Sequence, residues 1–175
     1  MFIYKPQEDT YVTLRLISRL KEKFNICIDV GAGSCALSDA LTRLCRHIVA
    51  IDINPYSCSA CRGRHDVLCS HGLSAITRAD LVVSNPPYLP PEEPPTDWET
   101  LAIYDYGLIN HILRWTYAYR PRMLILTFST LGRSDVIEEA VSALGRVVDK
   151  EIAHYFFEDI MSIAVEPLRP ASGSS

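Results

Sequence analysis

The most chemically informative stretch of the sequence is Asn85-Pro86-Pro87-Tyr88, which follows an apolar run at residues 79–84. The side-chain oxygen of Asn85 and the backbone carbonyl of Pro86 can accept the two N–H groups of a planar amine. Two consecutive prolines restrict the backbone, so the two acceptors stay fixed relative to each other. Tyr88 can pack against the face of a planar amide or base. The stretch predicts a rigid site for a neutral amino group, and the alternative is a plain proline-rich exit from a strand.

A second group of residues, earlier in the chain, has the character of a cofactor site. Gly31 and Gly33 follow an apolar run, and glycines at such a turn let a ligand approach the backbone closely. Polar side chains stand within or directly after the neighbouring apolar runs, at Asp29, Asp52, Asp66 and Asn85. Each side chain alone fits a cap or a solvated turn. Together they favour a ligand with a ribose and an adenine, bound at the carboxyl ends of parallel strands.

Alternating helices and strands must position these residues. Apolar spacing predicts helices at 8–24, 34–46, 57–64, 109–119 and 134–145, the first capped by Asp9 or Thr10 and the last closed by Gly145. Apolar runs predict strands at 26–30, 47–52, 65–70, 79–85, 122–129, 146–157 and 160–168. The alternation implies a mostly parallel sheet, but the last two strands are too close in sequence for a helical crossover and must be antiparallel. We therefore expect one α/β domain over residues 1–168 and a disordered polar tail over residues 169–175.

Length and composition set the protein class. A chain of 175 residues, 48% hydrophobic and 22% charged, suits a single globular domain. The net charge of −4 disfavours broad binding to a phosphate backbone. The first residues lack the basic and apolar segments of a signal peptide, and the apolar stretches are too short to span a bilayer. These features predict a cytoplasmic protein.

Six cysteines lie between residues 27 and 69, and they leave alternatives open. Cys58 and Cys61, with His65, Cys69 and His71 nearby, invite a zinc interpretation. The favoured interpretation places Cys58 and Cys61 on one face of a short helix as small buried side chains, either free thiols or disulfides of the kind found in hyperthermophiles. No metal site is predicted.

Four segments together resemble a known family. Residues 4–16, 29–34, 50–54 and 81–90 read YKPQEDTYVTLRL, DVGAGS, AIDIN and LVVSNPPYLP. In this order they resemble the HemK-like glutamine methyltransferases, which are class I S-adenosylmethionine-dependent enzymes with a Rossmann-like fold, and in particular their short archaeal and eukaryotic branch. The resemblance runs from about Tyr4 to Leu168.

The resemblance implies a role for each site residue. The methionine part of S-adenosylmethionine would lie on Gly31 and Gly33, with Asp29 at its amino group, the ribose on Asp52 and the adenine amine on Asp66. Thr10 would reach the methionine end, unless it only caps a helix. The implied catalytic residues are Asn85, Pro86, Pro87 and Tyr88. The implied cofactor contacts are Thr10, Asp29, Gly31, Gly33, Asp52, Ile53, Asp66, Val67 and Asn85.

The resemblance also implies a substrate and a partner. The expected reaction is methylation of the glutamine amide in the Gly-Gly-Gln loop of a peptide-chain release factor, with lysine as an additional protein target. A small zinc-binding activator subunit would add to the sheet edge at the third strand and form a heterodimer. Two alternatives remain: methylation of an exocyclic amine of adenine, cytosine or guanine, and a non-catalytic cofactor-binding subunit. The family has a glycine pair where this chain has Asp105-Tyr106-Gly107, at the lip of the target pocket. Asp105 also fits a helix N-cap.

Overall fold

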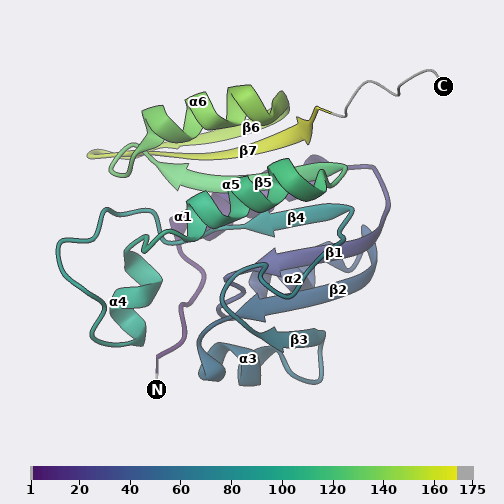
Figure 1. Cartoon of the computed structure of the whole chain (residues 1–175), viewed down its shortest axis with the longest axis horizontal. Helices are drawn as coiled ribbons and strands as arrows, with labels where there is room; N and C mark the ends of the chain where they lie inside the picture. The colour runs from purple at the N-terminus through teal and green to yellow at the C-terminus, as the bar shows by residue number, and fades with distance from the viewer. Residues whose placement is uncertain (1, 169–175) are drawn as a thin grey trace.

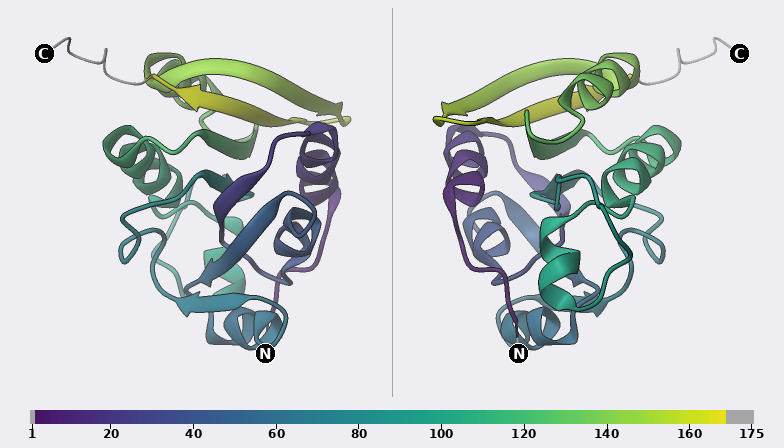
Figure 2. Two further views of the ribbon diagram at one scale, coloured as in Figure 1. Left: turned by 90° about the vertical axis from the view of Figure 1, so that its right-hand side faces the viewer. Right: turned by 90° about the vertical axis from the view of Figure 1, so that its left-hand side faces the viewer.

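The computed structural model describes residues 2–168, which form a three-layer α/β/α structure (Figures 1 and 2). Within these residues a seven-stranded sheet has the strand order β3-β2-β1-β4-β5-β7-β6. The strands are β1 (Phe24–Val30), β2 (Cys45–Asp52), β3 (Asp66–Cys69), β4 (Leu81–Ser84), β5 (Met123–Ser129), β6 (Gly145–His154) and β7 (Asp159–Pro167). The helices are α1 (Glu8–Arg19), α2 (Ala36–Leu41), α3 (Pro55–Cys61), α4 (Trp98–Ile103), α5 (Leu108–Tyr119) and α6 (Ser134–Leu144). The first five strands are parallel, and β6 and β7 are antiparallel to each other, as the sequence predicted. The structure adds that β7 lies next to β5 and is antiparallel to it.

The central strands are apolar on both faces because helices cover both faces. Consecutive side chains of a strand point to opposite sides, so Leu81 and Val83 of β4 pack on one side and Val82 on the other. The first side holds α1 and α2, represented by Leu16 and Leu41. The second side holds α5 and α6. This arrangement buries β1, β4 and β5 in the centre and leaves β3 and β6 as the two edges of the sheet.

The structure shortens two predicted helices and adds one. α1 ends at Arg19 because Leu20 adopts an extended conformation, and Phe24, which fits the helical spacing, is instead the first residue of β1. α2 ends at Leu41, well before the predicted residue 46. The N-cap of α1 is Gln7, and neither Asp9 nor Thr10 occupies that position. Thr10 still takes part in capping, because its hydroxyl accepts from the Gln7 backbone N–H at 3.5 Å in a capping box.

The remaining predictions about elements had different outcomes. Gly145 closes α6, as predicted. The short helix α4 was not predicted. No helix within residues 2–168 is long and apolar enough to cross a membrane. The predicted disordered tail lies outside the described residues.

The six cysteines form three disulfides: Cys27–Cys45, Cys35–Cys61 and Cys58–Cys69. The first joins β1 to β2, the second joins the glycine turn after β1 to α3, and the third joins α3 to β3. Among residues 2–168 no group of three potential ligands could hold a metal ion. Of the two alternatives left open by the sequence, the structure therefore favours disulfides over free thiols.

We expect the double variant Cys27→Ala/Cys45→Ala to lower the free energy of unfolding by about 3 kcal/mol, because a bridge across 18 residues restricts the unfolded chain. Urea denaturation without reductant measures this change. Wild-type protein treated with reductant, which opens all three bridges, is the control and should lose at least as much stability. Equal denaturation midpoints for oxidised and reduced wild-type protein would contradict the prediction.

Candidate functional site

A cavity of about 710 Å³ lies at the carboxyl ends of the parallel strands. Its volume falls in the range of small-molecule and cofactor sites. The topology places it there, because the strand order reverses between β1 and β4 and leaves a crevice at their ends. Val30 at the end of β1 pairs with Ser84 at the end of β4, so Gly31 and Asn85 follow paired positions. Both residues line the cavity, together with Gly33, Asp52, Ile53, Pro86, Pro87 and Tyr88. The sequence predicted all eight.

The glycine turn presents bare backbone to the cavity. Gly31 and Gly33 have φ values of +75° and +51°, which side chains other than glycine rarely adopt. Within the described chain no atom lies within 4 Å of the position that a Cβ on Gly31 would take. This space is a cradle for a ligand that approaches the backbone closely. At Gly33 a Cβ would instead meet the backbone oxygen of Tyr4 at 3.2 Å.

Asp52 orients the glycine turn after β1 and the turn at the end of β2. Its Oδ2 accepts from the Gly33 backbone N–H at 2.8 Å, and its Oδ1 accepts from the Asn54 N–H at 2.8 Å. Burial raises the pKa of this carboxyl above its usual value, while the backbone N–H groups oppose the shift. Carboxylate oxygens can accept more than one hydrogen bond, so Asp52 can still receive two ribose hydroxyls.

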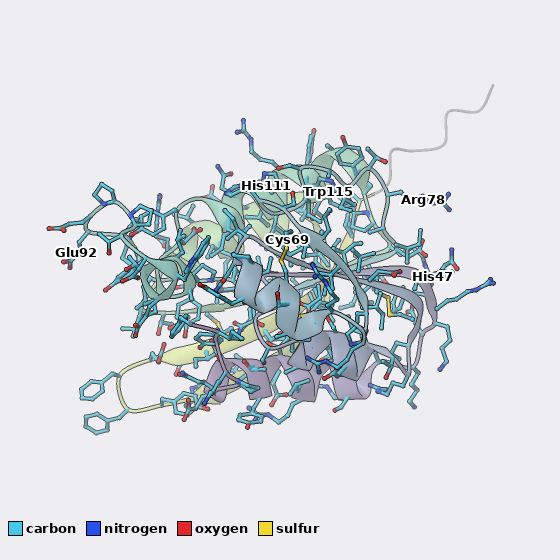
Figure 3. The ribbon with its side chains drawn as sticks, turned by 90° about the horizontal axis from the view of Figure 1, so that it is seen from below. His47, Cys69, Arg78, Glu92, His111 and Trp115 are labelled. Atoms are coloured by element: carbon cyan, nitrogen blue, oxygen red, sulfur yellow. A yellow bond between two sulfur atoms is a disulfide. The ribbon has the colours of Figure 1, made fainter. Side chains whose placement is uncertain are left out.

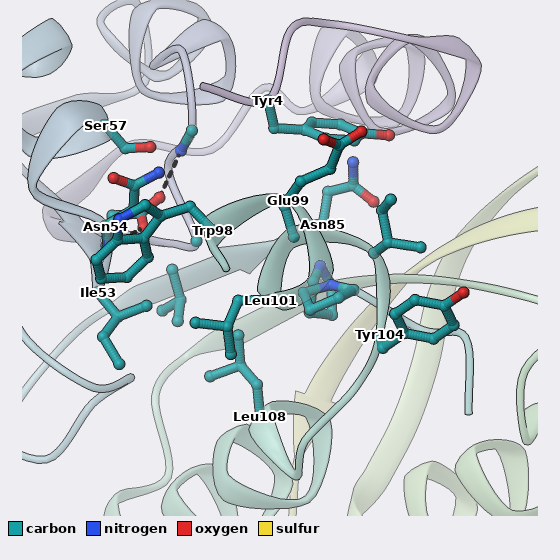
Figure 4. A pocket seen from close by; sticks show the side chains of 18 of the residues that line it. Tyr4, Ile53, Asn54, Ser57, Asn85, Trp98, Glu99, Leu101, Tyr104 and Leu108 are labelled. Carbon is teal, nitrogen blue, oxygen red and sulfur yellow. Dashed lines mark hydrogen bonds between the residues drawn. The ribbon is translucent and has the colours of Figure 1, made fainter. Parts of the chain in front are cut away.

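Among the described residues, only one of the two polar groups of the Asn85 carboxamide has a hydrogen-bond partner. Its Nδ2 donates to Thr10 Oγ1 at 3.5 Å, whereas its buried Oδ1 has no hydrogen-bond partner within residues 2–168. A buried acceptor without a partner costs about 1–3 kcal/mol, so its retention at a cavity wall points to a donor supplied by a ligand. Figure 4 shows Asn85 and Tyr4 at one end of the cavity and Ile53, Asn54 and Ser57 at the other.

The N-terminal segment packs over the cavity and was not predicted residue by residue. Phe2, Ile3 and Tyr4 line it. The Tyr4 hydroxyl donates to Asp9 Oδ2 at 2.8 Å, and burial together with Asp9 raises the pKa of Tyr4. Asn54 caps α3 and donates from Nδ2 to the Phe2 carbonyl at 2.8 Å, which joins the segment to the end of β2. The sequence carried a signal for this cap, since Asn54 precedes Pro55 at the first helical position.

Two predicted cofactor contacts lie behind the cavity wall. Asp29 is fully buried, and its Oδ2 accepts from the Ser38 N–H at 2.9 Å and the Ser38 hydroxyl at 2.6 Å. Burial raises the pKa of Asp29 to about 6. Thr10 contacts Asn85 instead of lining the cavity. Neither residue lines the cavity, but the buried Asp29 Oδ1 has no hydrogen-bond partner among the described residues, so their direct contact with the cofactor stays a prediction.

The placement of Asp66 and Val67 at the cofactor was wrong. Asp66 pairs with Val49 at the amino end of β3. It therefore lies at the amino ends of the parallel strands, whereas the cavity lies at their carboxyl ends. Val67, one residue on, packs beside Cys61. At the carboxyl end of β3 the cavity is lined by Ser70, His71 and Gly72.

The turn after β3 is held by α5. His111 accepts from the Leu73 N–H through Nε2 at 3.0 Å, and burial, together with the charge of His71, lowers its pKa. A Cβ on Gly72 would collide with the His111 ring. The position where the sequence predicted an acid for the adenine amine therefore offers serine, histidine and backbone groups.

Helix α4 and the turn after it form the lip of the cavity. Trp98, Leu101, Tyr104 and Tyr106 line it. The lip is joined to the proline-rich loop, because the Asp105 N–H donates to the Leu89 carbonyl at 2.8 Å. The Asp105 side chain accepts from the backbone N–H groups of Gly107 and Ile109 at the start of α5, but the N-cap of this helix is Gly107, whereas the sequence had suggested Asp105.

Comparisons with known proteins support this architecture. No family model matches the chain. A putative protein N5-glutamine methyltransferase of Methanocaldococcus jannaschii is 30% identical over 99 residues, which are 52% of this chain and 50% of that protein. The chain thus matches about half the length of this curated relative.

Solved structures resemble a larger part of the chain. A chain of the E. cuniculi Mtq2–Trm112 complex, which is responsible for methylation of the eRF1 translation termination factor, is 24% identical, with a TM-score of 0.75 over 96% of this chain and all of that one. The N-methyltransferase NodS of Bradyrhizobium japonicum WM9, solved with S-adenosyl-L-homocysteine, is 12% identical with a TM-score of 0.63, over 94% of this chain and 90% of NodS. The class I methyltransferase fold is confirmed, and the curated match supports the resemblance to HemK-like enzymes.

Proposed function

We propose that this chain is an S-adenosylmethionine-dependent N-methyltransferase whose target is the side-chain amide of a glutamine in a peptide-chain release factor. The observation that carries the proposal is the buried Oδ1 of Asn85, after the end of β4 and next to the glycine turn, which has no hydrogen-bond partner in the described part of the chain. Such an acceptor fits a neutral N–H donor. The M. jannaschii and E. cuniculi relatives, named for glutamine methylation and for methylation of a termination factor, support the choice of substrate.

The residues of the cavity fit the cofactor. Gly31 and Gly33 would hold its methionine part, Asp52 its ribose, and the Ser70–Gly72 turn its adenine end. S-adenosylmethionine supplies an electrophilic methyl group when bound. Asn85 Oδ1 and the Pro86 carbonyl would accept both N–H groups of the target, which fixes the nitrogen and stabilises positive charge that develops on it.

The charge of the lip favours a polypeptide over a nucleic acid. No lysine or arginine lies between Arg78 and Arg114, whereas Glu92, Glu93, Asp97 and Glu99 are exposed on the loop and helix at the lip. Figure 3 shows Glu92 projecting from the body of the molecule. A phosphate backbone would be repelled by this surface, since binding to it depends on Lys and Arg.

The test uses labelled S-adenosylmethionine and a purified release factor, with the chain co-expressed with its activator. We expect label in the wild-type release factor and none in a variant whose Gly-Gly-Gln glutamine is replaced by alanine. Cellular RNA and DNA, incubated in separate parallel reactions, serve as alternative substrates. Label that nuclease removes and protease does not would overturn the choice of substrate and favour methylation of a base.

The partner is part of the same proposal. β3 is the last strand on its side of the sheet within the described residues, so one side of its backbone is open to another strand. We place a small zinc-binding activator subunit there; the E. cuniculi complex of two proteins supports the existence of a partner subunit. Purification of the chain alone as a stable, fully active monomer would contradict it.

Gly132→Ala should slow methyl transfer to release factor by about 10-fold or more, because a Cβ there would press on the Tyr88 backbone oxygen and displace the proline-rich loop. Transfer kinetics and the dissociation constant for S-adenosylmethionine are measured together. Val136→Ala is the matched control, at a 44% exposed residue of α6 close in sequence to Gly132 and outside the cavity lining. A wild-type rate in Gly132→Ala would show that the loop tolerates this displacement.

A further inference from the structure

Two phenylalanines stand almost fully exposed at the tip of the β6–β7 hairpin. Phe156 is 93% exposed and Phe157 is 82% exposed. Their rings contact each other edge to face, with centroids 4.7 Å apart. Large aromatic side chains seldom stay in water as a pair, and such an apolar patch rimmed by polar residues marks an interaction site. Nothing in the cofactor cavity or the core uses these two rings.

Hydrogen bonds fix the tip in place. The Tyr155 N–H donates to the Glu158 carbonyl at 2.8 Å and closes the turn. Asp159 then joins the tip to the end of β5: its carbonyl accepts from the Thr130 N–H at 3.0 Å, and its own N–H donates to the Thr130 hydroxyl at 2.9 Å. The Ser129 hydroxyl also donates to the Glu158 carboxylate. The pair is therefore presented on a rigid support, which lowers the entropic cost of binding.

The tip lies on the side of the molecule where the target must enter. The parallel strands point toward the end of the sheet at which both the hairpin tip and α4 are found (Figure 1). Gly132, three residues after β5, packs directly on the backbone of Tyr88. The segment at residues 129–132 thus connects the hairpin, through the contact of Ser129 with Glu158, to the loop that carries Tyr88. Burial is the main cause of the raised pKa of Tyr88, and the charges of Asp9 and Glu158 add to it.

We propose that Phe156 and Phe157 form a docking point for the protein substrate, and that they bind an apolar patch with basic surroundings next to the loop that carries the target amide. This inference rests on the proposed function. Aromatic anchors dominate the binding energy of many interfaces. The acidic lip across the cavity favours a partner with Lys or Arg around its apolar patch. Glu158 and Asp159 beside the pair add less, because both are half-buried and already contact Ser129 and His154.

The position of the tip separates this partner from the activator. The tip joins β7 and β6, whereas the free side of β3 lies at the other edge of the sheet. A strand added to β3 therefore extends the sheet away from the hairpin. The carboxylates beside the phenylalanines also disfavour a nucleic acid as the occupant.

The test compares intact release factor with a short peptide that contains only the Gly-Gly-Gln segment. We expect Phe156→Ala/Phe157→Ala to lower kcat/KM for the intact protein by about 10- to 100-fold, mostly through KM, because each lost anchor is worth more than about 1 kcal/mol. The value for the peptide should not change. Phe156→Tyr/Phe157→Tyr should retain most of the activity on the intact protein. Tyr117→Ala, at a 64% exposed aromatic on α5, is the matched control and should behave as wild type.

The outcomes distinguish the two proposals. If wild-type enzyme methylates both substrates and the double alanine variant matches it on both, the docking inference fails alone. An equal loss on peptide and intact protein would also overturn it, because it would show an effect on the catalytic site. If wild-type enzyme methylates neither substrate, or labels nucleic acid instead, the proposed function fails and the docking inference fails with it.

Discussion

Asn85→Ala is expected to lower kcat for methyl transfer by about 10²–10³-fold, the loss typical when one group that stabilises developing charge is removed. In the wild-type chain the Asn85 Oδ1 lacks a partner among residues 2–168, while Nδ2 is anchored on Thr10 at 3.5 Å. Alanine removes the acceptor without changing the glycine turn or Asp52. The dissociation constant for S-adenosylmethionine, measured by calorimetry, should therefore stay near the wild-type value.

Thr10→Val is the matched control for this variant. It removes the hydroxyl that holds Nδ2 but leaves the acceptor, so we expect a smaller loss of kcat than in Asn85→Ala. A dissociation constant that rises in step with the loss of rate would assign Asn85 to cofactor binding. A wild-type rate in Asn85→Ala would remove the basis of the proposed function and favour the non-catalytic alternative.

Asp52→Ala is expected to weaken binding of S-adenosylmethionine by about 100-fold, since hydrogen bonds to a charged group are worth about 1.5–3 kcal/mol each. The carboxylate faces the cavity and also orders the Gly33 and Asn54 backbone at 2.8 Å each. Equilibrium dialysis with labelled cofactor measures the change. Thermal unfolding of the variant shows whether the turns remain ordered.

Asp66→Ala is the control that separates the structure from the sequence-based prediction. The structure places Asp66 at the amino end of β3, away from the cavity, so its removal should leave cofactor affinity unchanged. If Asp66→Ala weakens binding as much as Asp52→Ala, the sequence-based assignment of the adenine contact is right and the β3 register described here is wrong.

The sequence by itself determined the order of strands and helices and most of the site. Strand periodicity is local, so all seven strands were predicted. Gly31, Asp52 and Asn85 could be predicted as site residues because each ends or directly follows a strand. The carboxyl ends of parallel strands lie together on one side of the sheet. The apolar spacing was less reliable at helix ends: Phe24 continued the helical period but pairs with Cys45 in the sheet.

Only the tertiary structure decided which strand ends carry functional side chains and which residues surround them. Asp66 lies within a predicted strand, but its distance from the cavity depends on the register of β3 against β2. Because Asp66 pairs with Val49, it lies at the amino end of β3, away from the cavity. The partner of Asp29 is equally invisible in the sequence, since the bond to Ser38 arises only when α2 packs on β1. The hairpin tip that carries Phe156 lies at the carboxyl end of the parallel strands because β7 inserts between β5 and β6 and runs antiparallel to β5. Each of these contacts joins two separate elements, and the packing of those elements decides which residues meet. Local residue patterns contain no information on such pairings.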